Sequence, residues 1–564
     1  MKIELATLYT PFEKDLNPKK PWDVYPRPQF KRPSFINLNG KWNLEILRKE
    51  KIVFKGEIIV PFPLESRLSG VDFKKQTNDV MVYTKTIMYH KTQKNVLLNF
   101  GAVDQQCKVY VNDKFIGENV GGYLPFSFDI TTALKSGENT FRIEVVDTLD
   151  IELAYGKQTK KRGGMWYTET SGIWQTVWLE EVPQDYIKGI KVTPKLNGFD
   201  ITVFGGDNQK HLYVDGKKYS FCGESASVEI EKPVNWTPEN PKLYDITLIS
   251  GADEIKSYTA LRTIKVSGDK ILLNDKPYFF NGLLDQGYFS DGIYTSATAE
   301  AFKNDIIEMK KCGFNTLRKH IKIEHDIFYY YCDKLGMIVF QDLVNCGKYS
   351  FFVDTALPTI GLRKGITHKA TKKRRENFIK NSTDTLNLLY NHPCIVYYTL
   401  FNEGWGQFDA KNLYKMMKNI DPTRVWDATS GWFQTNESDV LSEHIYFKPL
   451  KLKNDGRPLV LSEFGGYSSK INDHSFNKTK TYGYRFFTDN EEFKKSLLKL
   501  YYDEVIPAIK NQGLCGTILT QVSDVEDETN GLLTYDRQVL KVDADQMLKM
   551  AADLNYAFNQ YINK

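Results

Sequence analysis

The sequence predicts a multidomain protein in which two β-sandwiches precede a (β/α)8 TIM barrel. Short extended runs separated by turn residues fill the chain to about residue 266, and helical and extended patterns alternate from residue 267 onward. A chain of 564 residues is also too long for one hydrophobic core. We therefore expect three domains, at residues 1–182, 183–266 and 267–564.

Residues 1–182 are expected to form a jelly roll. After a proline-rich beginning, extended runs recur without long helical patterns between them, which is typical of all-β sandwiches. These runs are 41–46, 96–100, 108–111 and 140–146. The region closes with 171–179 (SGIWQTVWL), which alternates and is expected to be one strand.

Residues 183–266 continue the same pattern in a smaller unit. Its expected strands are 189–192, 199–204, 228–230, 243–249 and 259–266. A size near ~100 residues suits an immunoglobulin-like sandwich. No catalytic constellation is visible there, so we expect a spacer.

Residues 267–564 are expected to form the barrel, which needs roughly 250 residues or more. The expected strands are 278–281, 314–318, 337–340, 395–400, 425–428, 440–444, 459–462 and 516–521. Helical patterns fill most gaps, among them 376–390 and 413–420. An apolar face at Phe302, Ile306 and Met309, ended by Gly313, is one such helix.

Composition narrows the partners and the compartment. The chain has 75 basic and 70 acidic residues, a net charge of +5, so neither nucleic acid nor an anionic membrane is expected as a partner. No run approaches the ~20 apolar residues of a membrane span, and the N-terminus lacks an apolar signal segment, so we expect a cytoplasmic protein. Seven cysteines without CxxC spacing argue against a disulfide framework and a zinc site. We expect no metal and no cofactor.

Two glutamates follow predicted barrel strands. Glu403 comes after strand 395–400 and Glu463 after strand 459–462, and glycines follow both. Active sites of barrels lie at this edge, and carboxyls ~5 to 5.5 Å apart cleave glycosidic bonds with retention. The alternative is that each glutamate only satisfies backbone N–H groups where a helix begins. Two glutamates in equivalent positions favour catalysis.

Four motifs, in order along the chain, resemble glycoside hydrolase family two, which includes β-galactosidases, β-glucuronidases and β-mannosidases. They are 171–175 (SGIWQ), 314–320 (FNTLRKH), 402–403 (NE) and 462–465 (SEFG). The resemblance covers nearly the whole chain and implies a sugar-binding jelly roll, an immunoglobulin-like sandwich and a catalytic barrel.

The resemblance also implies roles for four residues. Glu403 would be the general acid/base and Glu463 the nucleophile. Asn402 would donate to the sugar 2-hydroxyl, and Arg318 would hydrogen-bond the nucleophile and keep it ionised.

Further residues at strand ends fit the same site. Asp285, His320, His444 and Tyr446 are expected to bind substrate, and Tyr446 is placed to orient Glu463. For both histidines the alternative is a structural, hydrogen-bonded role. Trp405 and Trp432 are expected to stack on sugar, with core packing as the alternative.

The last predicted loop bears on the sugar. Glucuronide-specific members of the family carry Asn-x-Lys before a glycine, whereas this chain has ETNG at 528–531, which favours a neutral hexoside such as a β-galactoside. Other sugars, including arabinoside, glucuronide and mannoside, stay open. The acidic run from Asp524 to Glu528 lacks EF-hand spacing, so a solvated or hydroxyl-binding loop is favoured over a cation site.

The leading hypothesis is a retaining exo-β-glycosidase whose partner is an oligosaccharide or glycoside. A non-catalytic carbohydrate-binding protein on the same fold is the second hypothesis. A metal-dependent hydrolase is disfavoured because HExxH and paired His/Cys spacing are missing. The sequence leaves open the linkage and whether the chain forms a homo-oligomer.

Overall fold

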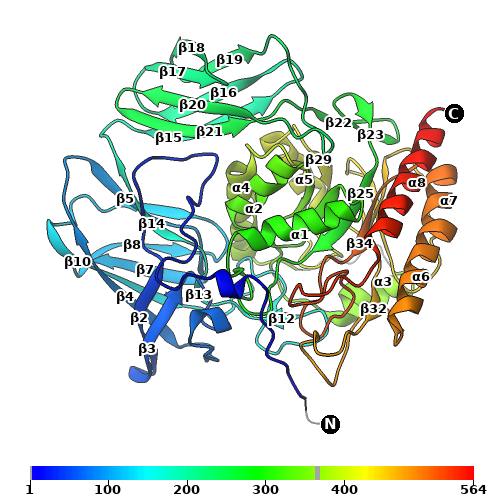
Figure 1. The fold of residues 1–564 in the computed structure, drawn as a ribbon, viewed down its shortest axis with the longest axis horizontal. Helices are drawn as coiled ribbons and strands as arrows, with labels where there is room; N and C mark the ends of the chain where they lie inside the picture. The colour runs from blue at the N-terminus through cyan, green and yellow to red at the C-terminus, as the bar shows by residue number, and fades with distance from the viewer. Residues whose placement is uncertain (1–2, 363–368) are drawn as a thin grey trace.

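The structure, a computed structural model, describes residues 3–362 and 369–564. Two all-β regions, coloured from blue to green, adjoin a barrel whose helices lie on the right of Figure 1. This arrangement confirms the predicted fold class. No helix in the described ranges is long and apolar enough to cross a membrane.

The first region consists of two facing antiparallel sheets, of order β1-β14-β5-β9 and β3-β2-β4-β10-β7-β8. Burial alternates along β2, so that Trp42, Leu44 and Ile46 meet Leu98 and Leu179 of the other sheet in one core. The strands are β1 (Phe35–Asn37), β2 (Gly40–Arg48), β3 (Lys51–Val60), β4 (Val80–Tyr89), β5 (Asn95–Phe100), β6 (Val103–Asp104), β7 (Gln106–Val111), β8 (Lys114–Val120), β9 (Phe126–Asp129), β10 (Gly137–Val146), β11 (Gln158–Thr159), β12 (Tyr167–Thr168), β13 (Gly172–Ile173) and β14 (Val177–Val182).

The prediction of one strand over 171–179 is wrong. The run divides into β13 and β14, which belong to different sheets. At the break, Trp174 turns inward and its indole N–H donates to Gly122 O at 2.7 Å. A buried indole needs such a partner, and here the partner lies off the strand axis.

The second region is also a two-sheet sandwich, of order β15-β16-β19 and β18-β17-β20-β21. Its strands are β15 (Ile187–Pro194), β16 (Gly198–Gly205), β17 (Gln209–Val214), β18 (Lys217–Cys222), β19 (Ser225–Glu229), β20 (Tyr244–Ser250) and β21 (Asp253–Thr259). The predicted strand 259–266 is wrong, because β21 ends where that run begins. Residues that follow lead to a small sheet of β22 (Ile264–Ser267), β23 (Lys270–Leu273) and β24 (Lys276–Pro277).

Eight parallel strands form the barrel, of order β29-β28-β27-β26-β25-β34-β31-β30. Most of their residues are apolar and buried, as parallel strands covered by helices require. The strands are β25 (Phe280–Asp285), β26 (Thr316–Lys319), β27 (Ile338–Asp342), β28 (Ile395–Thr399), β29 (Val425–Asp427), β30 (Leu441–Ile445), β31 (Leu459–Gly465) and β34 (Leu514–Thr520). The helices are α1 (Glu300–Lys311), α2 (Asp326–Leu335), α3 (Leu357–Thr359), α4 (Lys372–Leu389), α5 (Ala410–Ile420), α6 (Asn490–Leu500), α7 (Ile506–Gln512) and α8 (Ala544–Ile562).

The barrel closes between β25 and β34, and its seam lies between β29 and β30. No ladder joins these two strands, both of which are fully described. Asp439, just before β30, bridges the seam: its amide donates to Trp426 O at 3.0 Å and its carboxylate accepts from Trp426 N at 2.9 Å.

Each barrel strand begins or ends at least one residue away from its predicted bound, and two extend furthest beyond their predicted carboxyl ends. The first strand was expected at 278–281, but β25 runs to Asp285. Gly282 allows this, because a Cβ there would come within 2.5 Å of Ile518 on the neighbouring strand. The second, β31, continues beyond Ser462 to Gly465, so Glu463 lies inside the strand.

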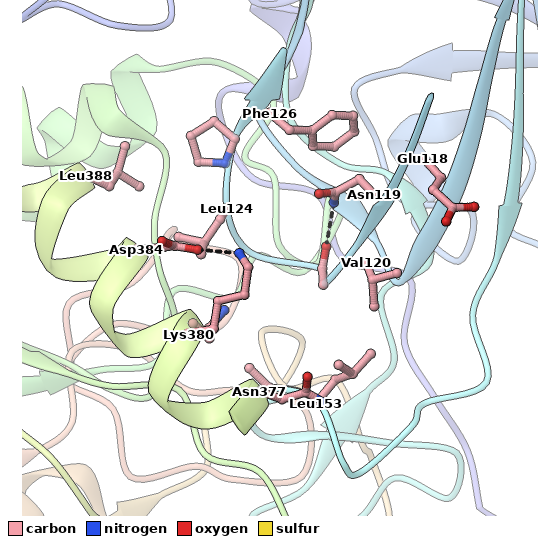
Figure 2. Close-up of a pocket in the computed structure, with 14 residues that line it drawn as sticks. Glu118, Asn119, Val120, Leu124, Phe126, Leu153, Asn377, Lys380, Asp384 and Leu388 are labelled. Atoms are coloured by element: carbon pink, nitrogen blue, oxygen red, sulfur yellow. Dashed lines mark hydrogen bonds and ion pairs between the residues drawn. The ribbon is translucent and has the colours of Figure 1, made fainter. Parts of the chain in front are cut away.

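The first sandwich also packs against the outside of the barrel. A groove of about 450 Å³ lies between the β8–β9 region and α4, and Figure 2 shows Lys380 and Asp384 of α4 paired at 2.6 Å on its wall. None of the predicted site residues lines this groove. The site is instead built at the carboxyl ends of the barrel strands, called the mouth below.

Candidate active site

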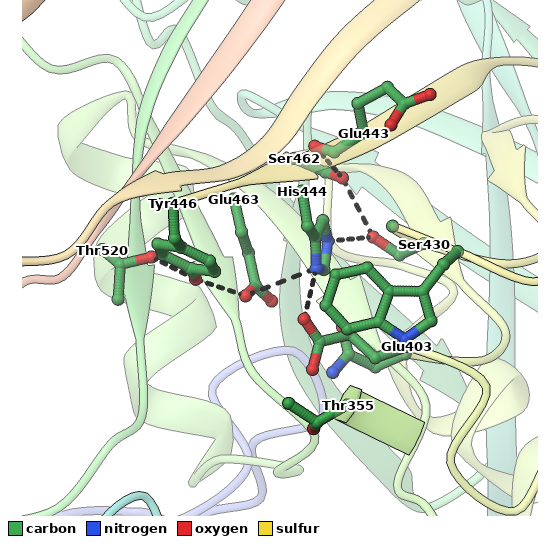
Figure 3. Close-up of polar contacts among 12 residues, drawn as sticks. Thr355, Glu403, Ser430, Glu443, His444, Tyr446, Ser462, Glu463 and Thr520 are labelled. Atoms are coloured by element: carbon green, nitrogen blue, oxygen red, sulfur yellow. Dashed lines mark hydrogen bonds and ion pairs between the residues drawn. The ribbon is translucent and has the colours of Figure 1, made fainter. Parts of the chain in front are cut away.

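The structure brings Glu403 and Glu463 together at the mouth (Figure 3). One carboxylate oxygen of each, and a ring nitrogen of His444, lie within 4.8 Å of one another. Both side chains are largely enclosed, with 13% of Glu403 and 6% of Glu463 exposed.

The backbone of Glu403 turns sharply after β28. Its φ is +53°, a left-handed conformation that is uncommon for a residue with a side chain. Its N–H donates to Ser430 O at 2.9 Å, which fixes this turn. Gly404 follows at φ +74°, and a Cβ there would meet the Phe433 ring at 2.1 Å. The turn directs the carboxyl into the mouth.

A bulge places Glu463. The register of β31 against β34 shifts between Leu461 and Phe464, and its register against β30 shifts at Glu443 and His444. A bulge changes the direction of side chains within a strand. Here it pairs Glu463 with His444 on the neighbouring strand.

Arg318 of β26 holds the strand ends together. Its Nε donates to Asp342 Oδ1 at 2.9 Å, its Nη1 to Glu463 Oε1 at 3.0 Å and its Nη2 to Asn402 Oδ1 at 2.9 Å. Only 1% of the side chain is exposed. Because Asn402 accepts through Oδ1, its NH2 group is left to donate toward the mouth.

Asp342 is the permanent counter-charge of this guanidinium. Burial raises the pKa of the Asp342 carboxyl, but the charge of Arg318 and the hydrogen bond from His320 outweigh burial and lower the pKa to about 2. Asp342 is therefore ionised at neutral pH.

The proton of His444 can be assigned from its partners. Arg318 Nη1, which can only donate, lies 3.3 Å from His444 Nε2, so Nε2 is an acceptor. Burial lowers the pKa of His444 to about 3, which leaves a neutral ring with its proton on Nδ1. Nδ1–H therefore donates to Glu403 Oε1 at 2.8 Å, with Glu463 Oε2 at 3.5 Å.

Glu463 accepts hydrogen bonds at both oxygens. Besides Arg318 at Oε1, the Tyr446 hydroxyl donates to Oε2 at 2.6 Å. Thr520 lies 2.9 Å from the same hydroxyl and, because the phenol proton is used, must donate to it. The Tyr446 ring stacks on Tyr484 with centroids 3.8 Å apart. These contacts fix the orientation of the Glu463 carboxylate.

Glu403 is in a different environment. Burial raises the pKa of its carboxyl, and the positive charges of Lys157 and Arg318 oppose this only in part. The two carboxyls therefore lie in different surroundings: Glu463 accepts from Arg318 and Tyr446, whereas Glu403 accepts from His444.

The other predicted residues lie around this centre. His320 Nδ1 lies 2.8 Å from Asp342 Oδ2, and burial lowers its pKa. Asp285 belongs to a separate charge cluster, in which Lys319 Nζ lies 2.7 Å from its Oδ2. The structure therefore brings His320 to the glutamates through Asp342 and leaves Asp285 beside them, bound to Lys319.

The two tryptophans have mainly packing contacts. Trp405 is 2% exposed, and its ring lies 5.4 Å from Tyr155 and 5.0 Å from Trp166. Trp432 is 8% exposed, lies 5.6 Å from the His444 ring and lines a groove of about 430 Å³ beside the site.

The acidic run 524–528 was expected to be a solvated or a hydroxyl-binding loop. The solvated alternative is wrong, because the carboxylates are buried, and hydroxyl binding stays a prediction. Asp524 pairs with Lys541 at 2.7 Å and Asp527 with Arg162 at 3.0 Å. Glu526 accepts from Thr168 N at 2.9 Å, and Glu528 accepts from the Tyr167 hydroxyl. The run is hydrophilic in sequence, but each of these four carboxylates has an ion-pair or hydrogen-bond partner outside the run.

Several site residues were not anticipated. Ser430, Ser462 and Thr520 hydrogen-bond within the network around Glu403, His444 and Glu463. They follow or end barrel strands, so the tendency of barrel active sites to lie at the carboxyl ends of strands could have indicated them. Tyr484 and Lys157 lie far from any barrel strand end in sequence, and no pattern marked them.

Glu403, His444 and Glu463 are also close enough for each to offer one ligand atom to a metal ion. The hydrogen-bond network gives His444 Nδ1 a proton, however, and a ligating nitrogen must carry none. Glu403, His444 and Glu463 therefore fit a hydrogen-bonded cluster better than a metal site.

Comparison with known protein families identifies both ends of this architecture. Residues 28–183 match the model "Glycosyl hydrolases family 2, sugar binding domain", and residues 264–542 match "Glycosyl hydrolases family 2, TIM barrel domain". The chain belongs to glycosyl hydrolase family 2. This membership confirms the resemblance read from the four motifs.

Curated family 2 relatives are distant. A β-galactosidase of Priestia megaterium is 23% identical over 437 residues, which cover 69% of this chain and 40% of that protein. A putative β-glucuronidase of Formosa agariphila is 24% identical over 449 residues, covering 70% and 51%. The chain thus spans between two fifths and about half of the length of these relatives.

Solved family 2 structures share the fold over almost the entire chain. A β-D-glucuronidase of Dictyoglomus thermophilum has a TM-score of 0.75 at 18% identity, with 94% of this chain and 98% of that chain covered. A β-galacturonidase of Eisenbergiella tayi has a TM-score of 0.71 at 17% identity, with the same coverage.

Proposed function

We propose that the protein is a retaining exo-β-glycosidase that removes terminal sugars from glycosides by double displacement. The observation that carries the proposal is the distance between the two carboxyls, whose nearest oxygens lie within 4.8 Å. At such a separation no water fits between nucleophile and sugar, so cleavage passes through a covalent glycosyl-enzyme.

The environments assign the roles. Glu463, which accepts from Arg318 and Tyr446, attacks the anomeric carbon. Glu403, whose pKa burial raises, protonates the departing oxygen and then takes a proton from the attacking water. The Asn402 NH2 group donates to the 2-hydroxyl, an interaction that strengthens in the transition state.

For the sugar we propose a neutral β-hexoside, with a β-galactoside first. The loop 528–531 carries a glutamate and no lysine, and several curated relatives are named β-galactosidases. A uronide is the second candidate, because relatives and structural neighbours are also named β-glucuronidase and β-galacturonidase.

Hydrolysis of 4-nitrophenyl glycosides tests the proposal. The panel contains β-galactoside, β-glucoside, β-mannoside, β-glucuronide, β-galacturonide and α-arabinoside. We expect Glu463→Gln to reduce kcat/KM on the best substrate by at least about 10³-fold, and proton NMR to show first the anomer that has the configuration of the substrate. The exposed Glu376→Gln is the matched control.

Two results would contradict the mechanism. One is unchanged activity in Glu463→Gln, and the other is a first product whose anomeric configuration is opposite to that of the substrate. Inactivity of the wild type on the whole panel, with retained sugar binding, would favour a non-catalytic carbohydrate-binding protein.

A further inference from the structure

A segment of the first sandwich crosses the mouth of the barrel. This crossing segment, residues 149–170, lies between β10 and β13 and contains β11 and β12. Figure 1 shows β12 beside the barrel, apart from the main sheets of the sandwich. The segment therefore belongs to the sandwich in sequence and to the active site in space.

One end of the crossing segment is anchored next to Glu403. The Tyr155 amide donates to Asn345 O at 3.1 Å and its hydroxyl to Gly347 O at 2.8 Å. The Tyr155 ring packs on Trp405, two residues beyond Glu403. At Gly156, with φ +65°, a Cβ would approach the carbonyl oxygen of Ile321 to 3.0 Å, so glycine is required for this close approach beside His320.

The other end is anchored on the acidic loop. Tyr167 donates to Glu528, Thr168 N donates to Glu526 at 2.9 Å, and Arg162 pairs with Asp527 at 3.0 Å. Two sets of anchors therefore fix the backbone on both sides of residue 157.

Lys157 lies on this fixed backbone, and its carbonyl oxygen accepts from Tyr167 N at 3.1 Å. Trp166, the ring nearest to its ammonium, packs at 5.0 Å on Trp405, two residues beyond Glu403. The charge of Lys157 also lowers the pKa of Glu403 and of Glu528. The ammonium nevertheless forms no ion pair or hydrogen bond within the part of the chain that the structure describes, and its nearest ring, Trp166, has its centroid 5.6 Å away.

Four other cations near the mouth, all within residues 3–362 and 369–564, are bound to carboxylates. Arg318 is bound to Asp342 and Glu463, Lys319 to Asp285 and Glu324, Arg162 to Asp527, and Lys541 to Asp524. An ammonium without a bonded partner at such a site can donate a hydrogen bond to an oxygen atom of a ligand.

We propose that Lys157 contacts the substrate and, together with Glu528, binds hydroxyl groups of a neutral sugar ring. This inference rests on the proposed function and deepens it. A lysine donates to a hydroxyl oxygen and a glutamate accepts from a hydroxyl proton, so a cation and an anion from two domains can hold two hydroxyls of one ring.

The hydrogen bonds of Glu528 support a hydroxyl partner over a substrate carboxylate. Its Oε1 accepts from Asn530 at 3.0 Å and its Oε2 from Tyr167, and each oxygen keeps a further acceptor position. A sugar carboxylate placed beside Lys157 would also face Glu528, whose negative charge disfavours it.

The test combines the removal of single hydroxyl groups from the substrate with the substitution Lys157→Met. The wild type and the variant are assayed on 4-nitrophenyl β-galactoside and on its 3-, 4- and 6-deoxy analogues. Lys161→Met, an exposed lysine on the same crossing segment, is the matched control. We expect Lys157→Met to lower kcat/KM on the parent sugar by about 10- to 100-fold, as for the loss of a charged hydrogen bond.

The expected signature is non-additivity on one deoxy analogue. For the deoxy analogue that lacks the hydroxyl bound by Lys157, Lys157→Met should lower kcat/KM by less than about a further 3-fold. Removal of the positive charge should also raise the pKa of Glu403 and move the basic limb of kcat/KM to higher pH, which a merely structural lysine would not do. Lys161→Met should show neither effect.

Additive losses on every analogue would overturn the proposal. So would a wild-type preference for 4-nitrophenyl β-glucuronide or β-galacturonide that Lys157→Met abolishes, because Lys157 would then bind a carboxylate. Calorimetry of methyl β-galactoside binding separates this inference from the proposed catalytic activity, because it needs no turnover. If the double variant Glu463→Gln/Lys157→Met binds about tenfold more weakly than Glu463→Gln, the contact is supported. Equal binding by the two variants rejects it.

Discussion

Removal of the Tyr446 hydroxyl isolates one contact of the proposed nucleophile. In Tyr446→Phe the ring remains stacked on Tyr484, while Glu463 Oε2 loses a donor at 2.6 Å. A hydrogen bond to a charged group contributes about 1.5 to 3 kcal/mol. Since 1.36 kcal/mol corresponds to about tenfold in rate, we expect kcat of Tyr446→Phe to be about 10- to 150-fold lower than that of the wild type.

The loss should appear in the second half of the reaction. When water cleaves the glycosyl-enzyme, Glu463 departs as a carboxylate, and the phenol stabilises the charge that reappears. With a 2,4-dinitrophenyl glycoside the first step needs little acid help, so deglycosylation limits kcat. We expect kcat and KM to fall together and a burst of dinitrophenolate to precede the steady state.

Tyr501→Phe is the matched control. Tyr501 is buried, its ring lies 5.5 Å from Phe464, and its hydroxyl has no hydrogen-bond partner among the described residues. Its kcat should stay within about twofold of the wild type, as expected away from functional contacts. If Tyr446→Phe also stays within that range, the hydroxyl does not support the nucleophile and the assignment of Glu463 is weakened.

Three further predictions follow from the charges. Glu403→Gln should lower kcat/KM about 10²- to 10⁴-fold on a methyl glycoside, while sparing a 2,4-dinitrophenyl glycoside; equal losses on both would refute acid catalysis by Glu403. Because burial raises the pKa of Glu403, wild-type kcat/KM should fall only as pH rises through that raised pKa, and a basic limb at its ordinary value near ~4.3 would contradict this. Burial lowers the pKa of His392, but Asp333 and Asp326 outweigh it and raise it to about 9. The resulting stability is complete below the unfolded pKa of ~6.5 and is lost as pH rises through 9, so Tm should decline more over that window in the wild type than in His392→Gln.

The sequence predicts the barrel well because functional polar residues of a barrel follow the carboxyl ends of its strands. Parallel strands carry their polar residues where they stop, and a run such as 395–400 followed by Asn402 and Glu403 marks such an end without any tertiary information. The fold class and family follow from such runs in order. Glu403 and Glu463 are close in space because strand order, set by the barrel, brings distant segments together.

Other features depend on contacts that no local pattern contains. The break of 171–179 depends on Gly122, which accepts from Trp174, and the bulge at Glu463 depends on the register of two neighbouring strands. The burial of 524–528 depends on Arg162 and Tyr167 of another domain. Each of these needs the packed chain, because a partner far away in sequence changes the energetic balance of a local segment.

The crossing segment has a consequence for how such a protein can be rearranged during evolution. A recombination that exchanged the first sandwich would leave both glutamates on the barrel but would replace Lys157 and the contacts that Thr168, Arg162 and Tyr167 make with Glu526, Asp527 and Glu528. Those three carboxylates would then each lose a partner from the sandwich, which lowers stability, and the sugar contact proposed for Lys157 would be lost with them. The sandwich and the barrel should therefore be inherited as a pair, whereas residues 183–266 supply none of the site contacts described above and are freer to vary.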